Sequence, residues 1–171
     1  YTGDLKPEDI TPQVEKEVGA VLEEHIRKAR EYGVDFDHWF LETPDEPGAH
    51  NAKAMGVMVR LCKRLHPEIR IYVNPSFWAG FDKDAVAPDE VIVDCLKDWY
   101  TLVDVSMPLV LNLDNRPEAL TYFTHDRLFN GQYNVSSQHM GADRAGLLHL
   151  PRIAAWDSLA RGMNWGGFYS Y

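Results

Sequence analysis

The sequence predicts an α/β fold, specifically part of a (β/α)8 TIM barrel built from about five parallel strand–helix units. The first observation is a repeat: short apolar runs typical of buried strands recur about every 30 residues, a spacing typical of βαβ units. The second observation is that patterns typical of amphipathic helices lie between these runs. A parallel sheet requires such crossover helices, so the two observations together predict an α/β architecture.

The expected helices share clear start or stop signals. Thr11 followed by Pro12 is typical of a helix N-terminus, because a capping hydroxyl precedes a proline in the first turn. Apolar residues then recur at helical spacing, and Gly33 is the expected C-cap. The other helices are expected over about 50–65, ended by His66-Pro67, and from Pro88, from Pro117 and from Pro151, the last one capped by Gly162.

The expected strands span residues 38–42, 69–73, 102–106, 132–137 and 165–170. Asp104 falls inside the third of them, where we expect a hydrogen-bonded interior carboxylate. Cys62 and Cys95 fall on the apolar faces of two expected helices. No CxxC spacing is present, so both are predicted to be buried free thiols.

Two architectures fit the repeat: a doubly wound open sheet and part of a barrel. No G-x-G-x-x-G turn follows the first strand, which weakens the dinucleotide-binding version of the open sheet. A complete barrel takes about 250 residues. A chain of 171 residues with five strands therefore predicts a single domain over 1–171, the C-terminal five-eighths of a barrel truncated at the N-terminal side.

The composition is that of a folded globular protein, with 45% hydrophobic and 25% charged residues. The net charge is −9 and no basic stripe is present, which argues against nucleic acid and anionic membranes as partners. No apolar run is long enough for a transmembrane helix. No HxH or HExxH spacing occurs, so we expect neither a metal nor another cofactor. The oligomeric state is left open.

The residues that follow the strands form the candidate site, because ligands bind beyond the carboxyl ends of parallel strands. In the stretch WFLETPDEPG, the first strand leads into Glu42, Asp45 and Glu46. The other candidates carry hydrogen-bonding or aromatic groups: Asn74, Trp78, Ser137, His139, Tyr169 and Tyr171. Carboxylates can transfer protons, and Trp and Tyr offer flat apolar faces with a polar group. This combination favours a sugar pocket.

Asp45 and Glu46 also have a purely structural interpretation. They precede the second helix, where carboxylates interact with the helix dipole by about 0.3–1 kcal/mol. This interpretation does not account for Glu42, which ends a buried strand. Both interpretations of the acidic pair stay open at this point.

Residues 40–75, FLETPDEPGAHNAKAMGVMVRLCKRLHPEIRIYVNP, resemble the core of family 123 glycoside hydrolases and of the bacterial domain-of-unknown-function family 4091. The Asp-Glu-Pro motif and the I-Y-x-x-P strand carry the resemblance, and RIAAWDSLARGMNWGGFYSY is similar to the end of those proteins. The resemblance implies a barrel that removes N-acetylgalactosamine by substrate-assisted catalysis with retention. It also implies Glu46 as the general acid/base and Asp45 as the residue that orients the acetamido group. An extracellular or periplasmic location is suggested by the resemblance alone.

The strand ends add one observation of their own. No acid follows the last two expected strands directly, whereas a two-carboxylate retaining enzyme needs a second acid about 5 Å from the first. The expected function is therefore a glycoside hydrolase of the substrate-assisted N-acetylhexosaminidase type, with a carbohydrate as its partner. The alternatives are a non-catalytic carbohydrate-binding barrel and an inactive fragment of a larger enzyme.

Overall fold

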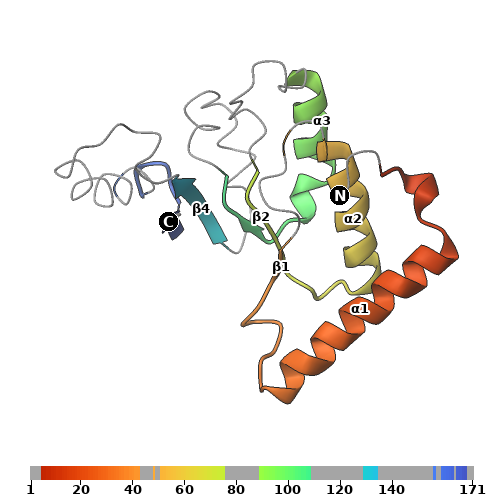
Figure 1. Ribbon diagram of the computed structural model, residues 1–171. Helices are drawn as coiled ribbons and strands as arrows, with labels where there is room; N and C mark the ends of the chain where they lie inside the picture. The colour runs from red at the N-terminus through yellow and green to blue at the C-terminus, as the bar shows by residue number, and fades with distance from the viewer. Residues whose placement is uncertain are drawn as a thin grey trace.

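The computed structural model describes residues 5–42, 48, 51–75, 89–108, 129–134, 156, 159–163 and 165–168. Its helices are η1 (Pro7–Asp9), α1 (Pro12–Glu31), α2 (Ala52–Leu65), α3 (Asp89–Asp98) and η4 (Tyr100–Leu102). Its strands are β1 (Leu41–Glu42), β2 (Ile71–Val73), β3 (Val105–Ser106), β4 (Phe129–Asn134) and β5 (Trp165–Phe168). Figure 1 shows α2 and α3 side by side on one side of the sheet, with α1 on the outer side of α2.

The long helix α1 begins and ends as its sequence predicts. The Thr11 hydroxyl oxygen accepts a hydrogen bond from the Val14 N–H at 3.3 Å, and Pro12 occupies the first turn. Gly33 follows the C-terminus with a φ of +72°, a left-handed conformation that favours glycine. Only Leu22 and Ile26 of α1 are buried. The helix therefore contributes a narrow apolar stripe to the core and exposes the rest of its surface.

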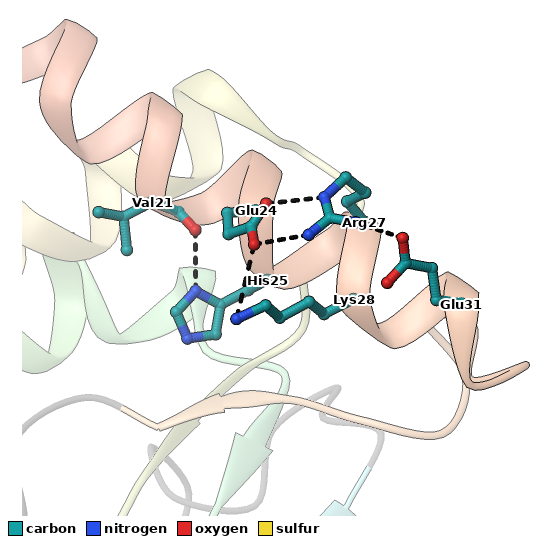
Figure 2. A network of polar contacts seen from close by, with 6 residues as sticks. All are labelled: Val21, Glu24, His25, Arg27, Lys28 and Glu31. Atoms are coloured by element: carbon teal, nitrogen blue, oxygen red, sulfur yellow. Dashed lines mark hydrogen bonds and ion pairs between the residues drawn. The ribbon is translucent and has the colours of Figure 1, made fainter.

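The exposed surface of α1 carries a network of ion pairs (Figure 2). The Arg27 guanidinium donates two hydrogen bonds of 2.7 Å to the Glu24 carboxylate and also pairs with Glu31. Lys28 Nζ lies 3.5 Å from Glu24 Oε1. The hydrogen bonds from Arg27 are the main reason why the pKa of Glu24 falls from 4.5 to about 2.

The core lies between the helices and one face of the sheet. Met55, Val59 and Cys62 of α2 are buried against Ile71 and Val73 of β2. Trp99 and Tyr100 close the core beyond α3, and both are almost completely buried. Gly56 lies in α2 directly against the Trp99 ring. A Cβ atom at this position would lie only 2.6 Å from Trp99 Cδ1. Only glycine lets these two segments approach to this distance.

All five strands run parallel, and their order in the sheet follows the order in the sequence, β1-β2-β3-β4-β5. The register aligns Leu41 with Ile71, and Glu42 with Tyr72. In the same way Tyr72 aligns with Val105, and Val105 with Phe129. Two strand–helix–strand successions, β1-α2-β2 and β2-α3-β3, are present, and parts of the segments that connect their elements lie outside the described residues.

The predicted barrel is wrong. In the described part of the chain the strands form an open ladder in sequence order, and no barrel-like unit is present. Three α-helices are described, not five strand–helix units. The strand order also shows no reversal, which a doubly wound sheet would require.

The individual elements agree with the prediction better than the architecture does. α2 ends at Leu65, directly before His66-Pro67, and both cysteines are buried free thiols. The helix expected from Pro117 lies outside the described residues. Of the helix expected from Pro151, the described residues Trp156, Leu159 and Ala160 are helical. No helix in the described ranges is both long and apolar enough to cross a bilayer.

Candidate functional site

The sheet has two faces with different surroundings. Successive side chains along a strand leave on opposite faces, and residues aligned in parallel register leave on the same face. Leu41, Ile71 and Val73 point toward the helices, because they pack in the core formed with α2 and α3. Glu42 and Tyr72 therefore leave on the opposite face, which we call the open face.

Two aromatic rings lie together on the open face. The rings of Phe40, just before β1, and Tyr72 of β2 stack with their centroids 4.9 Å apart and their planes inclined by 29°. The Tyr72 hydroxyl donates a hydrogen bond to the sulfur of Met107 at 3.7 Å, which anchors the ring toward β3. Phe40 stays 41% exposed, whereas Met107 is buried. We call the Phe40–Tyr72 pair the aromatic platform.

Two predicted site residues lie beside this platform. Glu42 ends β1, is aligned with Tyr72 and is exposed. Asn74 follows β2 directly and is only 5% exposed. Both residues lie where neighbouring parallel strands end, because β1 and β2 pair in parallel, and their roles as site residues stay predictions. Ser106 of β3 is also buried at this end of the sheet, but its hydroxyl bonds Tyr100 on the helix side at 2.6 Å.

The remaining predicted site residues lie outside the described residues. They are Asp45, Glu46, Trp78, Ser137, His139, Tyr169 and Tyr171. Their roles stay predictions from the sequence. The sequence interpretation missed Phe40 and Tyr72, although their spacing could have indicated them. Phe40 lies two residues before Glu42, and Tyr72 two residues before Asn74, which places each pair on one face of a strand.

Two grooves border α1 on the helix side of the sheet. The first, which we call the apolar groove, has a volume of about 380 Å³ and lies between α1 and α2. The second, the charged groove, has a volume of about 590 Å³ and is lined by Arg27, Arg30 and Glu31 of α1 with His66 and Glu68 among others. In the described residues, no group of three or more His, Cys, Asp or Glu side chains could hold a metal ion.

Comparisons with known proteins give a partial sequence match to one class of enzyme. No protein-family model matches the chain. Threonine–tRNA ligases from Listeria welshimeri and Listeria monocytogenes are 31% identical to it over 71 residues. The match covers 39% of this chain and 11% of each relative, so this chain corresponds to about a tenth of the length of those ligases.

This match corrects the predicted function. The relatives that it names are tRNA ligases, not glycoside hydrolases, so the prediction of a glycoside hydrolase with a substrate-assisted N-acetylhexosaminidase mechanism is wrong. The description of the chain as a hydrolase, a glycosidase and a TIM barrel is therefore also wrong. The resemblance of residues 40–75 to glycoside hydrolase family 123 and to domain-of-unknown-function family 4091 is not tested by these matches and stays a prediction.

Proposed function

We propose that this chain is a ligand-binding α/β domain whose aromatic platform holds the apolar face of a small carbohydrate. The observation that carries the proposal is the stacked Phe40–Tyr72 pair on the open face. A pyranose presents an apolar surface of C–H groups, which packs well against a flat aromatic ring. Phe40 remains exposed enough to offer such a surface to a ligand.

The polar groups beside the platform support the same ligand class. The exposed Glu42 carboxylate is acceptor-only, so it can accept hydrogen bonds from sugar hydroxyls. Asn74 brings an amide, which both donates and accepts. The resemblance of residues 40–75 to carbohydrate-active proteins adds support from the sequence. The proposal concerns binding and assigns no catalytic step to Glu42 or Asn74.

A titration of the chain with N-acetylgalactosamine, galactose and glucose, followed by isothermal calorimetry or NMR, tests the proposal. We expect Phe40→Ala to weaken saccharide binding about three- to tenfold, since an aromatic contact contributes about 0.5–1.5 kcal/mol. Tyr32→Ala is the matched control, because Tyr32 is an exposed aromatic at the far end of α1 and should leave binding unchanged. Absence of saccharide binding, or equal binding by Phe40→Ala, would rule the proposal out.

A second candidate function is a part in a threonine–tRNA ligase, and the partial sequence match favours it. The net charge of −9 disfavours direct tRNA binding by this chain, so its ligand would be threonine. Glu42 would then pair with the ammonium group of the amino acid. Glu42→Gln should abolish threonine binding, whereas a sugar hydroxyl can still bond the amide oxygen. Titration with threonine and with tRNA beside the saccharides therefore separates the two candidates.

A further inference from the structure

The apolar groove between α1 and α2 combines buried apolar residues with two carboxylates. It is lined by residues of α1, β1, α2 and β2: Glu17, Val18, Val21, Leu22, Leu41, Glu42, Met58, Val59, Cys62 and Ile71. Its floor is deep in the core, because Val59 and Ile71 are almost fully buried. Val21 is 56% exposed and lies at the rim. The volume of about 380 Å³ is within the range of small-molecule sites.

The charges around the groove are of one sign. Among the described residues of the lining, Glu17 of α1 and Glu42 of β1 are charged, and no Lys or Arg is present. The Glu17 carboxylate is oriented by Gln13, whose amide donates to Glu17 Oε1 at 2.6 Å. A carboxylate accepts several hydrogen bonds, so this contact leaves Glu17 able to accept another. The other described residues of the lining are apolar, apart from Cys62, whose thiol is a weak hydrogen-bond donor.

We propose that the apolar groove binds a small cationic amphiphile, an aliphatic amine whose hydrocarbon chain fills the groove while its ammonium group pairs with Glu17. Burial of the chain against Val18, Leu22 and Met58 supplies the driving force, which is proportional to the apolar area removed from water. The carboxylates then select the head group, because an ammonium is attracted and a carboxylate is repelled. Neither Phe40 nor Tyr72 lines this groove, which lies between α1 and α2, although the groove shares Glu42 with the polar groups beside the platform.

The charged groove does not offer the same chemistry. Its Arg27 already pairs with Glu24 and Glu31. The Arg30 guanidinium lies 5.7 Å from the centroid of the Phe36 ring, in a cation–π contact. The cations of that groove therefore have partners on the protein itself. The apolar groove combines an unfilled hydrocarbon surface with an acidic rim.

Calorimetric titration with octylamine, 1-octanol and octanoate, each below its aggregation limit, tests the head-group selection. We expect octylamine to bind roughly three- to tenfold more tightly than octanol, and octanoate more weakly than both. Glu17→Gln should reduce octylamine affinity to that of octanol without changing octanol affinity. Val21→Trp, which narrows the rim, should weaken all three. The matched control is Leu102→Trp, at an exposed apolar position on η4, which should change none of them.

Thiol alkylation gives a second, independent measurement. Cys62 lines the apolar groove and Cys95 does not, although both thiols are buried. Octylamine should therefore slow the reaction of Cys62 with iodoacetamide and leave Cys95 unaffected, as followed by peptide mass spectrometry. Equal binding of octylamine and octanoate, or equal protection of both thiols, would overturn the proposal. None of these measurements involves a saccharide, so their outcome is independent of the function proposed for the platform.

Discussion

The Lys63 ammonium lies 2.6 Å from Asp104 Oδ2 and joins α2 to the segment that leads into β3. The same carboxylate oxygen accepts a hydrogen bond from the Ile71 N–H at 2.9 Å, and Lys63 also donates to the Ile69 carbonyl at 2.7 Å. The two side chains are only 18% and 32% exposed. One partly buried pair therefore connects a helix with two neighbouring strands at the amino end of the sheet.

Replacement of Asp104 by Ala should lower the free energy of unfolding by about 1–3 kcal/mol, because it leaves the Ile71 N–H and the Lys63 ammonium without this acceptor. Urea denaturation monitored by circular dichroism measures the change. The matched control is Asp98→Ala, which breaks the more exposed Arg60–Asp98 pair and should cost no more than about 1 kcal/mol. Equal losses in the two variants would contradict a structural role of Asp104.

Gly56→Ala should destabilise the fold by about 1–3 kcal/mol or more, since the added methyl group would lie 2.6 Å from the buried Trp99 ring. Gly19→Ala in α1 provides the control within the same fold. There the nearest atom to the added Cβ is 4.0 Å away, on Leu65, so alanine should stabilise the helix by about 0.5–1 kcal/mol. Thermal unfolding of both variants measures the contrast. A stabilised Gly56→Ala variant would show that Trp99 can move aside.

The Glu24 carboxyl should titrate with a midpoint near pH 2 in the folded protein, as NMR of its side chain would measure. Its pKa is lower in the folded state than in the unfolded state, so its contribution to stability is present above pH 4.5 and is lost as the pH falls toward 2. Arg27→Gln should raise the midpoint toward 4.5. Because these groups are exposed, salt should also raise it. A midpoint that is insensitive to Arg27→Gln would contradict this cause.

Tyr100→Phe should cost about 1–3 kcal/mol of stability, since it leaves the buried Ser106 hydroxyl without the 2.6 Å bond to Tyr100. The double variant Tyr100→Phe with Ser106→Ala removes both polar partners and should recover part of this loss. Comparison of the two single variants and the double variant by urea denaturation gives the coupling energy. Additive losses would show that the two hydroxyls act independently.

The sequence predicted α1 and α2 well because the signals that start and end these helices are local. Thr11 and Gly33 mark the ends of α1 through their own backbone and side-chain chemistry. Asp104 was expected to be a hydrogen-bonded interior carboxylate of a strand. Its bond to the Ile71 N–H confirms the hydrogen bonding, but Asp104 lies one residue before β3 and its side chain is only partly buried. Helix caps and single hydrogen-bonded side chains depend on the residue type at one position, which can be identified in the sequence.

The strands and the architecture were predicted less well because they depend on distant residues. The first strand was expected from His38, but the His38 N–H bonds the Asp35 carbonyl in a turn, and pairing with β2 begins at Leu41. The fourth strand begins at Phe129 rather than 132, since Phe129 aligns with Val105. Closure of a sheet depends on how its outer strands pair, which the repeat along the chain does not encode. The stacking of Phe40 on Tyr72 was missed because it forms across two strands, although the spacing within each strand indicates the face on which each ring lies.

The sequential strand order also bears on how the chain folds. Among the described strands, each one after β1 pairs with the strand before it, so each of these pairings closes a loop of roughly 30 residues. Loop-closure entropy is then similar for each step, and each new strand extends an edge that already exists. Assembly can therefore proceed along the sheet one neighbour at a time, as the chain leaves the ribosome.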